Sequence, residues 1–193
     1  MDFMRTVPDK YFELAIVDPP YGIGGFAMVR DYEKCKDVNW DLNIPDLEYF
    51  EELRRVSVNQ IIWGANYFNC FNENGGAIIW VKNQPMPTFS KAEIASCSIG
   101  KKVEIYEKTW TNYVNEKQTD HPTEKPVALY KWLLKNYAKE GDKIFDSHLG
   151  SQSSRIACYD GGFDFVGCEL DKDYFDAGCK RFENHIKQLT MFQ

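Results

Sequence analysis

The chain has 193 residues, 44% hydrophobic and 15% aromatic, which is enough for one domain with a substantial core. This composition excludes a disordered chain and a small disulfide-stapled fold. The 29 acidic and 23 basic residues give a net charge of −6, which disfavours a protein that holds nucleic acid by charge alone.

The six cysteines form no C-x-x-C pair and match no zinc-ligand spacing, so we expect reduced, mostly buried thiols and no metal site. The first ten residues contain no apolar signal-peptide core. The longest purely apolar run, residues 77–81, is far shorter than a membrane span. These features predict a cytoplasmic protein with no membrane attachment.

Along the chain, short apolar runs alternate with amphipathic stretches. The first strand is expected at 14–17, followed by a long glycine-containing loop at 22–44. A helix beginning at Pro45 and strands at 61–63 and 77–81 come next, then a helix at 89–99 and a strand at 102–110. The last part predicts a helix from Pro126, a strand at 143–146, a helix at 151–160, a strand at 163–168 and a helix at 171–189. This alternation predicts a three-layer α/β fold with a mostly parallel sheet.

Acidic residues stand where three of the expected strands end. Asp18 and Asp146 each close a strand, and Glu169 follows a third. Ligands of open α/β sheets bind outside the carboxyl ends of the strands. We therefore expect the functional site at this edge.

The segment Asp146-Ser147-His148-Leu149-Gly150-Ser151 forms a strand end, a tight turn and a helix start. Backbone N–H groups at such a helix start suit an anionic group such as a carboxylate. Glu169, at the end of the next strand, is placed to accept hydrogen bonds from both ribose hydroxyls. Together they fit a nucleoside-bearing cofactor with a small anionic end. The alternative is an ordinary pair of strand-end turns with a solvated acid.

The second motif is Asp18-Pro19-Pro20-Tyr21. The prolines remove two backbone donors, so a carboxylate and free carbonyls form a pocket of acceptors only. Such a pocket suits an exocyclic amine, and Tyr21 offers a flat face for a planar ring. Acceptors that hold the amine hydrogens out of plane localise the nitrogen lone pair, which stabilises the transition state of its alkylation.

Asp18-Pro19-Pro20-Tyr21 resembles the catalytic motif of amino-directed DNA methyltransferases, whose Asp form most often belongs to adenine-N6 enzymes. The segment from His121 to Pro126 resembles the motif that precedes the cofactor half of this family. The cofactor turn and Glu169 stand at the corresponding places, and further segments resemble the secondary motifs: 63–67, 80–82 and 89–93. The resemblance covers nearly the whole chain.

The catalytic half comes first, which is the circularly permuted order of the β group. The resemblance implies a Rossmann-like, S-adenosylmethionine-dependent methyltransferase sheet with one antiparallel strand, for which 102–110 is our candidate. It divides a single domain, 1–193, into a catalytic half (1–110), a reduced target-recognition region (111–120) and a cofactor half (121–193). It also implies that the base is held by Asp18, Pro19, Pro20 and Tyr21, and the cofactor by Asp18, His121, Thr123, Lys125, Asp146, Ser147, His148, Gly150, Ser151 and Glu169. For Lys125, a surface lysine at a helix start is the alternative.

The chain departs from the family pattern at two places. Ser147 and His148 replace a rigid apolar pair, and Gln152 replaces a glycine at the helix start. The recognition region is about ten residues long, too short for a module that buries roughly 600–1,000 Å² on DNA. The loop at 22–44 is either a further DNA contact or a mobile lid. We also expect that the strand beside that of Glu169 is absent, which leaves an exposed sheet edge.

The resemblance implies an adenine-N6 DNA methyltransferase of phage or restriction-modification type, which flips the base. The net charge of −6 predicts that it binds DNA weakly and with little sequence discrimination. A homodimer or a partner subunit would supply the missing contacts. The alternatives are N-methylation of cytosine N4, an RNA adenine or a glutamine amide, and a non-catalytic partner subunit.

Overall fold

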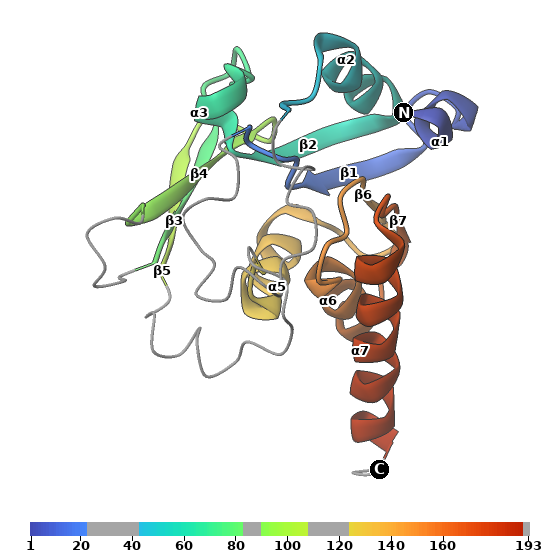
Figure 1. Cartoon of the computed structure of the whole chain (residues 1–193). Coiled ribbons are helices and arrows are strands. Elements are labelled where there is room, and N and C mark those ends of the chain that lie inside the picture. The colour runs from blue at the N-terminus through green and yellow to red at the C-terminus, as the bar shows by residue number, and fades with distance from the viewer. Residues whose placement is uncertain (23–42, 83–89, 108–123, 191–193) are drawn as a thin grey trace.

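In a computed structural model, the chain forms one seven-stranded sheet with helices on both faces (Figure 1). The structure describes residues 1–22, 43–82, 90–107 and 124–190. The strands are β1 (Phe12–Val17), β2 (Ser57–Trp63), β3 (Ala77–Val81), β4 (Ala92–Cys97), β5 (Val103–Glu107), β6 (Lys143–Asp146) and β7 (Asp164–Gly167). The helices are α1 (Asp2–Thr6), α2 (Leu47–Val56), α3 (Ala65–Phe68), α5 (Val127–Tyr137), α6 (Ser153–Gly161) and α7 (Lys172–Thr190).

The strand order is β5-β3-β4-β2-β1-β6-β7. β4 runs antiparallel to both of its neighbours, β2 and β3. The other pairs, β1 with β2, β1 with β6, β6 with β7 and β3 with β5, are parallel. The predicted mostly parallel three-layer fold with one antiparallel strand is confirmed.

Two predictions in the middle of the chain are wrong. The expected helix at 89–99 is instead strand β4, whose small residues Ala95 and Cys97 are buried in the centre of the sheet. Residues 102–110 were the candidate for the antiparallel strand, but β5 pairs parallel with β3. The reason is that β4 is antiparallel to β3, and the turn after β4 reverses the chain once more, so β5 has the same direction as β3.

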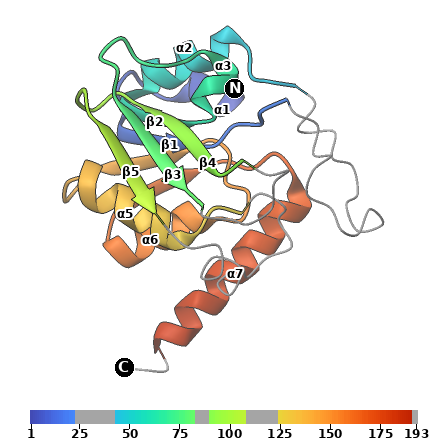
Figure 2. The ribbon, with the colours of Figure 1, turned by 90° about the vertical axis from the view of Figure 1, so that its left-hand side faces the viewer.

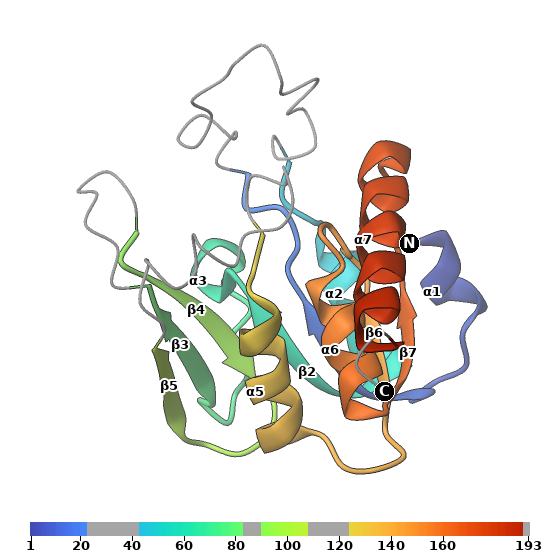
Figure 3. The ribbon, with the colours of Figure 1, turned by 90° about the horizontal axis from the view of Figure 1, so that it is seen from below.

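Each face of the sheet has its own hydrophobic core. On one face α5 and α6 cover β1, β2, β3 and β4, with Leu129 and Leu133 of α5 fully buried. On the other face α1 and α2 cover β1, β2 and β6, with Leu53 and Val56 buried. Figure 2 shows the β5–β3–β4 end of the sheet between these helix layers, and Figure 3 shows α5, α6 and α7 in front of the sheet.

β7 lies at one edge of the sheet and, within the described ranges, pairs only with β6. Among the described cysteines, Cys70, Cys97 and Cys158 are buried thiols, as predicted, and Cys168 and Cys179 are half-buried. No helix in the described part of the chain has the length and apolar character to cross a membrane.

Gln152, which replaces a family glycine, precedes α6 in a left-handed backbone conformation with φ +61°. This is the conformation that glycine adopts most readily. The Gln152 side chain is fully buried, and its amide donates to the carbonyl of Phe175 at 3.0 Å. It lies against Gly178 of α7, where an added Cβ would be 2.5 Å from the Gln152 Cγ. The glutamine is therefore accommodated by a glycine on the neighbouring helix.

We expect Gly178→Ala to destabilise the fold by about 1–3 kcal/mol, because the new methyl group overlaps the Gln152 side chain. Combining it with Gln152→Gly should recover part of this loss, since the overlapping side chain is then absent. Chemical denaturation of both single variants and the double variant gives the coupling energy. Additive effects would contradict the contact. Lys180→Ala, at an exposed position of the same helix, serves as the control and should change stability by less than about 0.5 kcal/mol.

Candidate active site

The carboxyl ends of β1, β6 and β7 meet at one edge of the sheet, because these neighbouring strands are parallel. A cavity of about 800 Å³ lies at this edge. Its lining includes eight of the predicted site residues: Asp18, Pro20, Lys125, Ser147, His148, Gly150, Ser151 and Glu169. One cavity therefore touches both the catalytic motif and the predicted cofactor turn.

The remaining predicted residues are placed differently. Pro19, Tyr21 and Asp146 are not in the cavity lining, although each is a sequence neighbour of a residue that is. His121 and Thr123 lie outside the described residues, as does the predicted recognition region at 111–120 and most of the loop at 22–44.

Asp146 is buried beneath the cofactor turn, with 1% of its surface exposed. Its carboxylate accepts hydrogen bonds from the Ser154 hydroxyl at 2.6 Å and the His148 backbone N–H at 3.0 Å. Burial raises the pKa of Asp146 to about 7, although these two donors lower it in part. In this structure Asp146 fixes the shape of the turn.

Ser147 and His148, the two departures from the family pattern, form a polar chain with α2. The Tyr49 hydroxyl lies 2.7 Å from the Ser147 hydroxyl, which is 2.9 Å from Nδ1 of His148. Burial lowers the pKa of His148 to about 4, so the ring is neutral at physiological pH. Tyr49 thus supports the turn where an apolar pair is absent.

Glu169 joins the turn to the end of β7. One of its carboxylate oxygens accepts from the Gly150 N–H at 2.8 Å, and the other from the Asp171 N–H at 3.0 Å. Each carboxylate oxygen has two acceptor sites, so each retains capacity for a further donor. Glu169 therefore holds the glycine turn and still presents an acceptor to the cavity.

Tyr21 donates a 2.6 Å hydrogen bond to Oδ1 of Asp18. Burial and the charge of Asp18 raise the pKa of Tyr21, so it remains a donor. The ring stacks on Tyr67 with a centroid distance of 4.9 Å, and Gly64 approaches it so closely that a Cβ would overlap the ring. The Tyr67 contact thus occupies one face of the ring that the sequence offered for stacking.

Lys125, the last residue but one of the predicted motif before α5, reaches the carboxylate of Asp18. Its ammonium forms ion pairs with Oδ2 of Asp18 and with Oε2 of Glu93, the latter at 3.0 Å, and lies 3.2 Å from the Tyr21 hydroxyl. Its side chain is 4% exposed, so it is not a surface lysine. Burial lowers the pKa of Lys125, but Asp18 and Glu93 outweigh that effect and raise it.

Glu93 on β4 also pairs with Lys82, which follows β3. Burial raises the pKa of Glu93, but the two lysines outweigh this and lower it to about 2. Two carboxylates and two ammonium groups thus form one charge-balanced cluster, in which Lys125 is buried and the other three side chains are half-buried.

A second buried ion pair ties α7 to the same region. Arg181 binds Glu124, the neighbour of Lys125, at 2.8 Å. The same guanidinium donates to the carbonyl of Ser151 at 2.8 Å and to the hydroxyl of Ser153 at 2.9 Å. Arg181 therefore fixes the start of α6 relative to the segment that carries Lys125.

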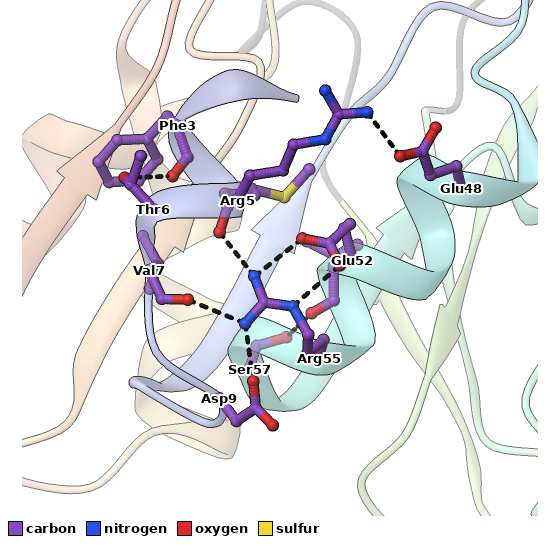
Figure 4. A network of polar contacts seen from close by, with 11 residues as sticks. Phe3, Arg5, Thr6, Val7, Asp9, Glu48, Glu52, Arg55 and Ser57 are labelled. Carbon is purple, nitrogen blue, oxygen red and sulfur yellow. Dashed lines mark hydrogen bonds and ion pairs between the residues drawn. The ribbon is translucent and has the colours of Figure 1, made fainter.

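Helix α1 forms one wall of the cavity through residues 1–4. Arg55 of α2 holds this wall, as Figure 4 shows. Its guanidinium binds both oxygens of Glu52, the carboxylate of Asp9, and the carbonyls of Met4 and Val7, all at 2.7–2.9 Å. All five N–H donors of the side chain are thus used.

The sequence alone assigns no role to four of these supporting residues: Tyr49, Lys82, Glu93 and Arg181. Lys82 and Glu93 lie in segments that resemble the secondary motifs of the family. The resemblance therefore indicates these positions, but not what the two side chains do. Tyr49 and Arg181 have ordinary helical spacing, and their partners are distant in the chain, so no local pattern pointed to them.

The sequence matches the family model described as DNA methylase, of the N6/N4 type, over residues 12–180. It is 28% identical over 82 residues to the type II methyltransferase M.HpaI of Haemophilus parainfluenzae, covering 42% of this chain and 26% of that protein. It is 30% identical over 71 residues to the DNA adenine methyltransferase YhdJ of Escherichia coli K12, covering 37% and 24%. These alignments span about a quarter of the relatives' length.

Solved structures with the same fold include M1.HpyAVI in complex with SAM, with a TM-score of 0.61, 22% identity and coverage of 93% of this chain and 92% of that one. Another is the cytosine-N4-specific PvuII DNA methyltransferase, with a TM-score of 0.60, 13% identity and coverage of 93% and 82%. At these identities the likeness concerns the fold alone.

We expect Arg55→Met to release the α1 wall, because the carbonyls of Met4 and Val7 lose their donor. The backbone amides of Arg5 and Val7, which donate to the carbonyls of Met1 and Met4, should then exchange with solvent roughly tenfold faster. Hydrogen–deuterium exchange with mass spectrometry measures this. Arg54→Met, the neighbouring exposed arginine, should leave the exchange unchanged. Equal protection in both variants would show that Arg55 does not hold the helix.

Asp146 should make stability fall as pH rises. Its pKa is raised to about 7 in the folded state, against about 3.9 in an unfolded chain, so folding favours the protonated form. Its stabilising contribution is complete below pH 4 and is lost as pH rises through 7. Between pH 5 and 8 the wild type should lose about 2–3 kcal/mol relative to Asp146→Asn, measured by urea denaturation. A parallel pH dependence of the two proteins would refute the raised pKa.

Proposed function

This chain belongs to the DNA methylase family, and we propose that it transfers a methyl group from S-adenosylmethionine to N6 of adenine in DNA. The observation that carries the proposal is the shared cavity. Asp18 of the amine-binding motif and the turn from Ser147 to Ser151 line the same space, so amine and cofactor would meet there.

The cavity suits the cofactor in size and in donor set. About 800 Å³ lies within the range of pockets that enclose ligands of this kind. Glu169 retains acceptor capacity for the ribose hydroxyls, and the Gly150–Ser151 turn precedes a helix that favours a carboxylate. Ser147 and His148 would line the methionine part, supported by Tyr49.

When bound, S-adenosylmethionine supplies an electrophilic methyl group on a sulfonium. Asp18 and the carbonyls near Pro19 and Pro20 would accept the hydrogens of the target amine. This localises the nitrogen lone pair and stabilises the positive charge that grows on nitrogen as the lone pair is donated. Asp18 need not remove a proton first, because the methylated amine is acidic and releases one after transfer.

Adenine is favoured by the Asp form of the motif and by the local identity to YhdJ, a DNA adenine methyltransferase. Cytosine N4 is the second candidate, since the PvuII enzyme with that specificity has the same fold. The net charge of −6 favours weak binding of DNA with little sequence discrimination. A second copy or a partner subunit would add contacts, in a phage or restriction-modification setting.

The direct test is mass spectrometry of nucleosides after the protein is incubated with mixed genomic DNA and S-adenosylmethionine. N6-methyladenine supports the proposal, and N4-methylcytosine transfers it to the second candidate. Cofactor binding without any methylated nucleoside would point to an RNA, a protein amide or a required partner. Absence of cofactor binding would indicate a non-catalytic subunit.

Asp18→Ala should reduce methyl transfer by at least a hundredfold, because the amine loses its charged acceptor. Cofactor affinity, measured by calorimetry, should stay within a few fold. Asp176→Ala, which removes an exposed carboxylate of α7, is the matched control and should retain full activity. Activity above a tenth of normal in Asp18→Ala would rule out the acceptor-pocket mechanism.

A further inference from the structure

The Lys125 ammonium is surrounded by three oxygen atoms, from Asp18, Glu93 and Tyr21. We infer that Lys125 occupies the subsite of the target amine, and that it withdraws from Asp18 and stays anchored on Glu93 when the base enters. The inference rests on the proposed function, because it concerns how the base gains access to Asp18.

Both groups of this ion pair line the cavity, whereas Glu93 is not among the lining residues. Lys125 thus stands between a carboxylate that faces the ligand space and one that lies deeper. Its three N–H donors match the three surrounding acceptors. The other oxygen of Asp18 is already taken by the Tyr21 hydroxyl. Each oxygen of Asp18 therefore already carries one donor. A second acceptor site remains on each oxygen, but an amine that binds at Oδ2 has to share its negative charge with the full positive charge of Lys125, so the two groups compete electrostatically.

Glu93 makes this exchange feasible. A buried ammonium that loses its partner is strongly destabilised. Lys125 has a second carboxylate 3.0 Å away, so it can release Asp18 and remain paired. Lys82 pairs with the same carboxylate and keeps it ionised. Glu93 is therefore a positioning residue, which acts on the base through Lys125.

The exchange favours the transition state over the bound substrate. A neutral amine replaces an ammonium beside Asp18 when the base binds, which weakens ground-state binding. As the amine donates its lone pair, its nitrogen becomes positive and restores the charge that Lys125 withdrew. Asp18 thus gains its full electrostatic partner only during reaction, which is differential binding.

The inference predicts opposite effects from two substitutions. Lys125→Met removes the competitor, so the preference of the pocket for an amine should increase. Glu93→Gln removes the alternative anchor and holds Lys125 on Asp18, so the preference should decrease. A cluster that served folding alone would be weakened by either change, and both variants would then move in one direction.

The experiment measures binding of short oligo(dT) strands that carry one deoxyadenosine or one deoxynebularine, a purine without the amine, in the presence of S-adenosylhomocysteine. The ratio of the two dissociation constants reports the amine contact. We expect about a fivefold rise of this ratio in Lys125→Met and about a fivefold fall in Glu93→Gln. Lys135→Met, an exposed lysine of α5, should match the wild type. Deoxycytidine and its analogue without the amine provide the same ratio for cytosine.

A second readout needs no base. Acylation of lysines, followed by mass spectrometry, should find Lys125 as protected in Asp18→Asn as in the wild type, because Glu93 still holds it. Reactivity equal to that of Lys135 would overturn the inference, as would equal shifts of the binding ratio in both variants. If the wild type shows no amine preference with either base, the proposed function fails as well.

Discussion

The contact between Lys125 and Asp18 joins two halves of the chain that are far apart in sequence. Asp18 follows β1, and Lys125 precedes α5, which covers the opposite face of the sheet from α2. Lys125 is buried and Asp18 is half-buried, so the ammonium depends on its carboxylate partners for its place in the interior. Glu93 and Lys82 extend the pair to β4 and β3, and Glu124 with Arg181 extends the same segment to α7. The position of the proposed amine pocket relative to the proposed cofactor turn therefore depends on a few ionic contacts.

The two sides of the cavity are supported in different ways. The side that contains Asp18 is held by charge, through the cluster around Glu93. The cofactor side is held mainly by hydrogen bonds to backbone groups, from Asp146, Glu169 and Arg181. Backbone contacts fix the course of a loop without specifying its side chains. This explains how Ser147 and His148 can replace an apolar pair while the turn keeps its geometry.

Much of the architecture was predictable because the signals are local. The apolar runs at 14–17 and 77–81 lie in strands, and the carboxylates that end β1 and β6 share one edge, as the parallel order requires. The sequence predicts a helix at 89–99 where the structure has strand β4, because alanine and serine suit both a helix and a buried strand. The strand conformation of this segment depends on its pairing with β2 and β3, which lie on either side of it in the sheet. A short stretch of sequence does not contain these partners. The placement of Lys125 beside Asp18 was missed for the same reason, since it depends on contacts across the sheet.

The packing of Gln152 against Gly178 makes the two positions dependent on one another. Restoring the family glycine at 152 would leave an unfilled space beside α7, whereas enlarging residue 178 would exclude the glutamine. Related chains should therefore carry matched pairs at these positions, and a cofactor turn transplanted between them should fail unless its helical counterpart is exchanged too. The turn and Gly178 of the last helix therefore have to change together.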